Sequence, residues 1–209
     1  MNDALKIVEF MDTVEKLCYV KRKAKRNDGS NENDSDHIMR LCFLVMMVSE
    51  YIKQPVNKKK LLEMALVHDL VEAETGDFNV IDQISNPEIR KEKIKAEKQA
   101  IDKYRKLLPD PLGNRIYELF IEYEAQETIE SKIVCALDKQ ESDLHANKEV
   151  DFCDDYYEKP GYKERIEGKK EHKFLKMTNE KIIGDIENLL FDLSMKNMEK
   201  CKKMKLLKK

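Results

Sequence analysis

Residues that interrupt helices are scarce in this chain. It has 6 glycines and 5 prolines among 209 residues, whereas Lys, Glu, Leu, Ile and Met are abundant. These abundant residues favour helices, and a chain of many strands needs more turn-forming residues than this one has. We therefore predict an all-α protein. Its length favours a single compact domain, and a hydrophobic content of 41% is sufficient for a core.

Apolar residues recur at helical spacing along most of the chain. A polar stretch interrupts this pattern at residues 21–36, where we expect a loop. Residues 148–175 show no clear period, and the lysine-rich end, residues 196–209, either extends the last helix or frays. Helices are expected at about residues 3–18, 34–53, 58–74 (ended by Gly76), 86–108, 110–123, 128–144 and 179–194.

Charge and cysteine usage limit the class of protein. The 39 basic and 41 acidic residues nearly cancel, so nothing calls for a stable nucleic-acid partner. The five cysteines are odd in number and lack a CxxC spacing, which indicates reduced thiols in a cytoplasmic protein. The longest apolar run, Leu41–Val48, is too short to span a membrane, and the N-terminus lacks a signal-peptide core. We expect a soluble cytoplasmic protein.

The segment LVHDLVEAETGDF, residues 66–78, concentrates the groups that carry chemistry. His68 and Asp69 are consecutive, and Glu72 lies three to four residues later on the same helical surface. Asp77 follows and can fold back over that surface. Burying these charges among apolar neighbours is unfavourable without a partner, and a bound cation would supply one. The alternative is a solvated acidic face at the end of a helix.

Two distant positions favour the metal. His37 begins the preceding helix after the letters ENDSD, and Asp138 lies in the apolar context IVCALDKQ, where a lone carboxylate is out of place. The ordered set H…HD…D formed with His68 and Asp69 resembles the HD-domain superfamily of metal-dependent phosphohydrolases. Its finer pattern resembles the small branch related to the 5'-deoxyribonucleotidases. The matching segments are 28–41, 64–78, 107–112, 122–132 and 136–140.

The resemblance implies one divalent metal ion (Mn, Co, Mg, Zn, Fe or Ni). Its implied ligands are His37, His68, Asp69 and Asp138. Two imidazoles and two carboxylates suit a first-row metal and leave positions open for water and a phosphate oxygen.

The resemblance also implies which residues work beside the metal. Glu72 and Asp77 match the catalytic acidic pair of the family. Arg22 and Arg40 match basic positions and are expected to bind substrate. The nucleotidase branch carries an Arg-Thr-Gly-Trp-like element before the first histidine, whereas this chain has RKAK at residues 22–25 and no tryptophan. The preference for base and sugar therefore stays open.

These roles imply hydrolysis of a phosphomonoester, above all a nucleoside 5'-monophosphate, by metal-activated water. One alternative is hydrolysis of a phosphodiester or pyrophosphate at the same metal site. Another is a non-catalytic, nucleotide-binding regulatory HD module, although the retention of Glu72 and Asp77 argues against it.

The organisation of the chain completes these expectations. Residues 1–150 are expected to form the HD-type domain, and residues 151–209 a C-terminal helical extension, with a lysine-rich tail, packed on it. Apolar stripes on the first and last helices predict a homodimer. His145, seven residues after Asp138, is either a residue near the metal or a surface histidine, and we expect the latter.

Overall fold

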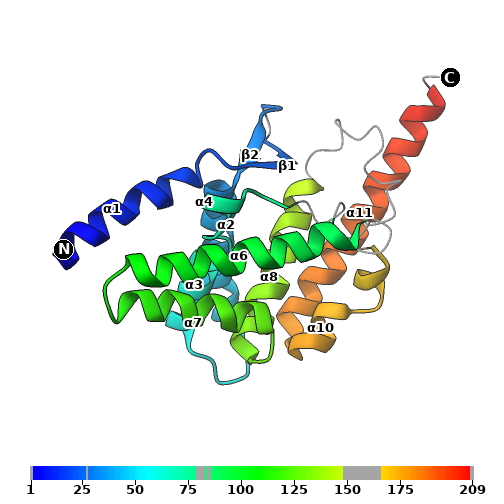
Figure 1. The fold of residues 1–209 in the computed structure, drawn as a ribbon. Coiled ribbons are helices and arrows are strands. Elements are labelled where there is room, and N and C mark those ends of the chain that lie inside the picture. Colours follow the sequence, from blue (N-terminus) through cyan, green and yellow to red (C-terminus); the bar gives the residue numbers. More distant parts are fainter. Residues whose placement is uncertain (1, 27, 79–82, 84–85, 148–165, 208–209) are drawn as a thin grey trace.

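The computed structural model describes residues 2–26, 28–78, 83, 86–147 and 166–207, and this part of the chain is almost entirely helical (Figure 1). A two-stranded antiparallel sheet is its one sheet. The elements are α1 (Asp3–Lys16), β1 (Lys21–Lys25), β2 (Asn31–Asn33), α2 (Asp34–Ser49), α3 (Lys58–Val67), α4 (Glu72–Thr75), α6 (Pro87–Leu107), α7 (Leu112–Ala125), α8 (Ile129–Ala146), α10 (Lys173–Thr178) and α11 (Lys181–Leu207). The all-α prediction is confirmed.

Helices α2 and α8 begin at residues whose side chains cap the helix N-terminus. The Asn33 side chain accepts a hydrogen bond from the backbone N–H of Asp36, whose carboxylate reaches back to the Asn33 N–H. Thr128 likewise accepts from the backbone N–H of Ser131 at the start of α8. Because such caps depend on residues three positions apart, they are readable from local sequence.

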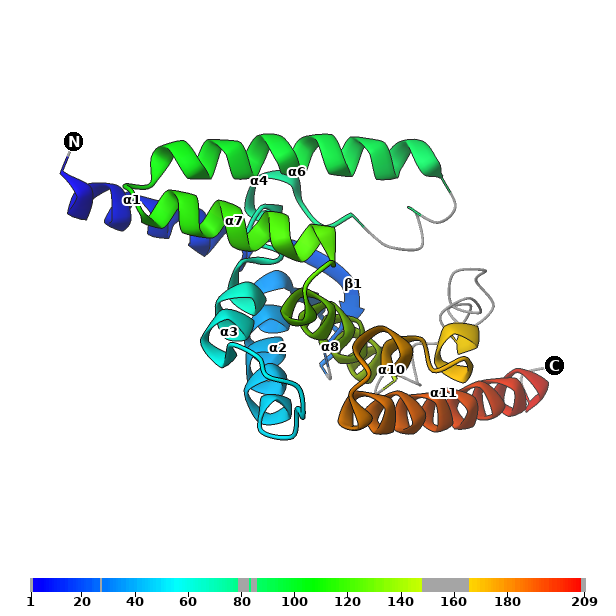
Figure 2. The same ribbon diagram turned by 90° about the horizontal axis from the view of Figure 1, so that it is seen from below.

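Helix α8 is the central element. It contacts α2, α3 and α7 on one side and α10 and α11 on the other (Figure 2). Its apolar face meets the other helices in a core of fully buried side chains, which include Leu41, Leu61, Met64, Ile133 and Leu137. The polar side chains of α8 therefore lie beside the core, where α8 packs against α2 and α3, and they form the site described below.

Residues 21–36 are not a loop, so that expectation is wrong. Residues 21–25 and 31–33 form the paired strands β1 and β2, in which Lys21 pairs with Asn33, and residues 34–36 are the first turn of α2. Local turn chemistry closes the hairpin, because Asp28 accepts a hydrogen bond from the Ser30 backbone at 2.9 Å. The strand sequence KRKAK lacks apolar alternation, and β1 contacts α8, so its pairing depends on tertiary contacts that local sequence does not reveal.

The single helix expected over residues 58–74 is also wrong. Helix α3 ends at Val67, a tight turn follows, and α4 begins at Glu72. In the turn the backbone N–H of Leu70 donates to Val67 and that of Glu72 donates to Asp69, both three residues back. Gly76 ends α4 with a φ of +72°, as expected for a glycine stop. The turn contains no glycine or proline, so nothing in the local sequence marks the break between the two helices.

The last helix is longer than its apolar stripe. Helix α11 continues to Leu207, so the lysine-rich end extends it within the described residues. Gln140 of α8 donates a hydrogen bond to the backbone carbonyl of Ile183, and Glu180 accepts from the backbone N–H groups of Lys53 and Gln54. No described helix combines the length and apolar composition needed to cross a membrane.

Candidate metal centre

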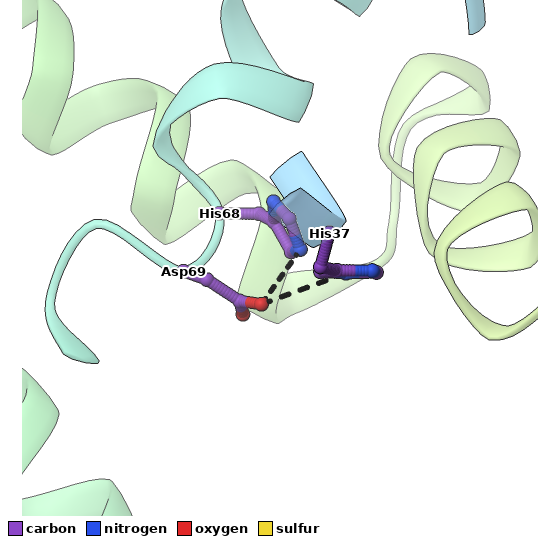
Figure 3. Close-up of side chains that lie close together, drawn as sticks. All are labelled: His37, His68 and Asp69. Carbon is purple, nitrogen blue, oxygen red and sulfur yellow. Dashed lines mark ion pairs between the residues drawn. The ribbon is translucent and has the colours of Figure 1, made fainter. Parts of the chain in front are cut away.

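The four predicted ligands converge from three parts of the chain. His37 lies in the first turns of α2, His68 and Asp69 lie in the turn after α3, and Asp138 lies in the middle of α8. The Nε2 atom of His37 is 3.1 Å from Asp138 Oδ1 and 3.7 Å from Asp69 Oδ2. The Nε2 atom of His68 is 3.1 Å from Asp69 Oδ2 and 4.0 Å from Asp138 Oδ1. Figure 3 shows both imidazoles facing the Asp69 carboxylate.

Both imidazoles are oriented by their other ring nitrogen. His37 Nδ1 lies 2.5 Å from Glu141 Oε2, and His68 Nδ1 lies 2.9 Å from the backbone carbonyl of Ala65. An ionised carboxylate and a carbonyl only accept hydrogen bonds, so each Nδ1 carries the donating proton. Each Nε2 is consequently left to present its lone pair toward the carboxylates.

These donors fit a divalent cation. Both Nε2 atoms are buried and make no hydrogen bond with the residues that the structure describes, although each lies 3.1 Å from a carboxylate oxygen. The ligand atoms of His37, His68 and Asp69 lie within 4.8 Å of one another. Two lone pairs facing two carboxylates repel unless a positive charge lies between them, and imidazole with carboxylate suits a first-row metal.

The ionisation of these groups reflects the same demand for a cation. Burial and the charge of Arg22 lower the pKa of His37, but Asp138 and Glu141 raise it, to about 9. Burial raises the pKa of Asp138, but Lys139 and His37 outweigh it and hold this pKa well below its usual value. Asp138 is therefore a carboxylate, and its surroundings bind either a proton on His37 or a metal ion.

The predicted catalytic pair lies next to these groups. Glu72 is buried, and burial together with Asp69, Asp34 and Asp77 raises its pKa well above the usual value. Burial also raises the pKa of Asp77, and Asp69 adds to this effect. Asp34, which sequence reasoning missed, is fully buried beside Glu72, and burial and Asp69 raise its pKa to about 6. Burial and neighbouring carboxylates thus raise the pKa values of Glu72, Asp77 and Asp34, whereas Asp138 stays ionised.

The two predicted substrate-binding arginines have different surroundings. Arg22 on β1 lies in the site, with its Nη1 atom 3.2 Å from Asp69 Oδ2 and 3.4 Å from Asp34 Oδ1. Burial lowers the pKa of Arg22, but Asp69 and its acidic neighbours outweigh this and raise it, so the residue stays charged. Arg40 lies on the Nδ1 side of His37, where it forms ion pairs with Glu141 and Glu32.

Comparison with known proteins agrees with this geometry. Residues 14–187 match the family described as HD domain. The chain belongs to the HD-domain family. The 5'-deoxynucleotidase HDDC2 of Homo sapiens is 33% identical over 162 residues, which cover 77% of this HD-domain chain and 74% of the human protein. The 5'-deoxynucleotidase hdd1 of Schizosaccharomyces pombe is 33% identical over 149 residues, covering 68% of this chain and 72% of that protein.

Solved structures share the fold of this HD domain. A predicted metal-dependent phosphohydrolase from Magnetospirillum magnetotacticum superposes with a TM-score of 0.75 at 23% identity, covering 93% of this chain and 96% of that one. A conserved hypothetical protein from Pyrococcus furiosus superposes with a TM-score of 0.64 at 23% identity, covering 87% and 99%. The match to the first structure extends into the C-terminal helices, because it covers 93% of this chain.

Further residues support the ligands of this HD domain. The Tyr123 hydroxyl donates to Asp138 Oδ2 at 2.7 Å, and Lys139 Nζ donates to the same oxygen at 2.8 Å. Glu141 reaches the opposite nitrogen of His37, as described above. A signal for Glu141 was present, since it lies three residues after Asp138 on one helix face. Tyr123 is fifteen residues away, and nothing local pairs it with Asp138.

His145 is buried, so its assignment to the surface is wrong. Its exposed fraction is 7%, and its Nε2 atom lies 3.7 Å from Glu32 Oε1. It lies on α8 two turns after Asp138, and the β1–β2 hairpin, which sequence reasoning missed, carries Glu32 against it.

Proposed function

We propose that this HD domain hydrolyses phosphomonoesters with a divalent metal ion, and that its substrates are nucleoside 5'-monophosphates. The observation that carries the proposal is the convergence of two buried imidazole Nε2 atoms, each without a hydrogen bond among the described residues, on the carboxylates of Asp69 and Asp138. The names of the relatives support a 5'-deoxynucleotidase in particular.

The residues that would hold the ion are His37, His68, Asp69 and Asp138. When bound, a divalent cation supplies Lewis acidity toward a phosphate ester and toward water. The ligands leave one side open, because Asp69 keeps 18% of its side-chain surface exposed whereas both histidine side chains are fully buried. Substrate therefore enters from the Asp69 side.

The remaining polar residues bind and protonate the substrate. Arg22 is held between Asp69 and Asp34, so its guanidinium is positioned to neutralise a phosphate next to Asp69. Glu72 is a buried carboxyl group with a raised pKa, which suits it to donate a proton to the leaving 5'-oxygen. Asp77, after the Gly76 turn, accepts the proton of the attacking water. The alternative activities on diesters or pyrophosphates use the same groups.

The test is a substrate panel. Purified protein loaded separately with Mn²⁺, Co²⁺ or Mg²⁺ is assayed on ribo- and deoxyribonucleoside 5'-monophosphates, 3'-monophosphates, dinucleotides and cyclic nucleotides. Chromatography of the nucleoside product accompanies the measurement of released phosphate. We expect turnover of 5'-monophosphates by the wild-type protein and none by the Asp69→Ala variant. Equal rates in that variant, or hydrolysis confined to diesters or pyrophosphates, would contradict the proposal.

We also propose that the protein is a homodimer. Leu5, Val8 and Met11 form an exposed apolar stripe on the N-terminal half of α1, while Phe10 packs on Tyr104. A stripe of this kind is typical of an interface. Light scattering should give the mass of two chains for the wild-type protein and of one chain for Val8→Lys, and a wild-type monomer would contradict the proposal.

We further propose that the protein is cytoplasmic and that its chain consists of a domain and a C-terminal extension. Among the described cysteines, Cys18, Cys42 and Cys135 are free thiols, which supports a reducing, cytoplasmic location. The division into a domain of residues 1–150 and an extension of residues 151–209 is supported by the packing of α10 and α11 on α8. Microscopy of a tagged protein tests the first proposal, and limited proteolysis tests the second.

A further inference from the structure

His37 is clamped between two carboxylates of one helix. Asp138 and Glu141 lie three residues apart on α8, and their carboxylates reach opposite nitrogens of the His37 ring, at 3.1 Å from Nε2 and 2.5 Å from Nδ1. Residues at this spacing share a helix face, so α8 presents both groups to α2 at once. The second contact has a different role from the first, because Nδ1 points away from Asp69 and His68.

Arg40 holds the second carboxylate. It lies three residues after His37 on α2, and its Nε atom donates to Glu141 Oε1 at 2.5 Å. Its Nη2 atom forms an ion pair with Glu32, which is buried on β2. Two of the three guanidinium nitrogens are thus committed to carboxylates of this chain.

The contacts continue back to the other side of the site. Glu32 Oε2 lies 3.3 Å from Arg22 Nε, and Arg22 Nη1 lies 3.2 Å from Asp69 Oδ2. Charges of alternating sign therefore connect His37 to Asp69 through α8, α2 and the hairpin. A change at Glu141 would be transmitted to the orientation of His37, because the imidazole has no other partner at Nδ1 among the described residues.

We propose that Glu141 is a positioning residue that fixes the tautomer and ring orientation of His37 for metal binding, and that Arg40 holds Glu141 in place and does not bind substrate. This inference rests on the proposed metal-dependent function only in requiring that a divalent cation binds. A carboxylate on the distal nitrogen of a ligating histidine keeps its proton away from the metal and makes the ligand more basic.

The test measures metal affinity without nucleotide. Titration calorimetry with Mn²⁺ and Co²⁺ is performed on the full chain and on Glu141→Ala and Glu141→Gln. We expect the Kd of Glu141→Ala to rise about 10–100-fold, the typical loss for such a partner. Glu141→Gln is nearly isosteric and keeps an accepting oxygen, so it should recover part of the affinity. A Kd equal to that of the wild-type protein in Glu141→Ala would overturn the proposal.

A matched control separates positioning from general destabilisation. Glu187 is a fully buried glutamate on α11 that accepts hydrogen bonds from the backbone N–H groups of Phe174 and Leu175. Glu187→Gln should lower thermal stability and leave the metal Kd unchanged. A similar loss of affinity in both variants would show that any buried glutamate has this effect, and would also overturn the proposal.

Arg40→Ala distinguishes the two roles of the arginine. If Arg40 holds Glu141, its removal raises the metal Kd, leaves KM at saturating metal unchanged, and adds little in the Glu141→Ala background. A raised KM with an unchanged metal Kd would instead make Arg40 a substrate-binding residue. Because the Kd needs no substrate, failure of the nucleotidase proposal does not affect this measurement.

Discussion

Helix α8 carries two buried polar clusters that differ in how completely their groups are paired. Toward its middle, Asp138 faces the Nε2 atoms of His37 and His68, neither of which makes a hydrogen bond within the described structure. Toward its end, Asp143 and Asn147 face α11 in what we call the docking cluster. That cluster is composed of Asp143, Asn147, Lys169, Ser194 and Asn197.

The docking cluster has a partner for each of its main polar groups. Lys169 Nζ lies 3.0 Å from an Asp143 oxygen. The Asn147 amide donates to Ser194 Oγ at 3.0 Å, and the Asn197 amide donates to the Asn147 carbonyl at 2.7 Å. A satisfied buried network holds helices together, whereas one with orphaned atoms is destabilising unless something binds there. The difference assigns one cluster to architecture and the other to function.

The largest effect should separate the two aspartates of α8. Asp138→Asn should reduce kcat/KM by about 10³-fold, because loss of one ligand charge removes several kcal/mol of metal-dependent stabilisation. Asp143→Asn should keep wild-type kcat/KM at a temperature where it is folded. Steady-state kinetics at saturating metal measure both. Comparable losses of kcat/KM in the two variants would mean that both clusters are needed for activity.

The opposite separation is expected for stability. Lys169→Met removes the ion pair between Lys169 Nζ and Asp143 from a buried setting, and this should lower the free energy of unfolding by about 3 kcal/mol. The double variant with Asp143→Leu should recover most of this loss, since neither charge of the pair is then left buried. Urea denaturation monitored by circular dichroism measures both. A single variant as stable as the wild-type protein would contradict the assignment of this cluster to architecture.

Removing a carboxylate from the metal centre should increase the free energy of unfolding, whereas Lys169→Met lowers it. Burial and Asp69 raise the pKa of Asp34 from 3.8 to about 6 in the folded protein. The folded state therefore binds more protons than the unfolded state between these values, and stability falls as pH rises from about 4 to about 6. In the metal-free protein, Asp34→Asn should raise the free energy of unfolding by about 1–2 kcal/mol above pH 6.

This stabilisation should shrink as pH falls from about 6 to about 4, where Asp34 is protonated in the folded state. Thermal melts in a chelator between pH 4 and pH 8 measure it. Asn86→Asp, at the exposed cap of α6, serves as a control for adding or removing a carboxylate on the surface. A destabilised Asp34→Asn variant at pH 8 would mean that the carboxylate is held by Arg22 and is not strained.

The two clusters also show which parts of a site a sequence contains. His68 and Asp69 are adjacent and, together with His37 and Asp138, recur in a known order, so the predicted ligands could be named without a structure. Caps such as Thr128 act over three residues and were equally readable. These features depend on local or ordered patterns, which are visible in the amino-acid sequence.

Other features depend on contacts between distant segments. Asp34 is charged and lies near a helix start, so sequence alone indicates a solvated cap and not a buried carboxyl group beside Glu72. The turn after Val67 likewise contains no glycine or proline, and the hairpin, although Asp28 and Gly29 mark its turn, has no apolar alternation in its strands. Tyr123, which donates to Asp138, belongs to this second class, whereas Glu141 is readable as a neighbour of Asp138 on one helix face although its contact with His37 is not.

The smallest predicted effect concerns the link between Glu72 and Asp77. Gly76 joins them with a φ of +72°, where a Cβ would meet no atom within 4 Å. Gly76→Ala therefore introduces backbone strain without a clash, and should lower stability by about 1 kcal/mol. Gly113→Ala is the contrasting control, because its Cβ would lie 2.4 Å from the Arg105 carbonyl oxygen and cause a larger loss. If urea denaturation gave the same loss in free energy of unfolding for Gly76→Ala and Gly113→Ala, the turn at Gly76 would be packed against other groups. The open side of the metal centre would then be narrower than its geometry indicates.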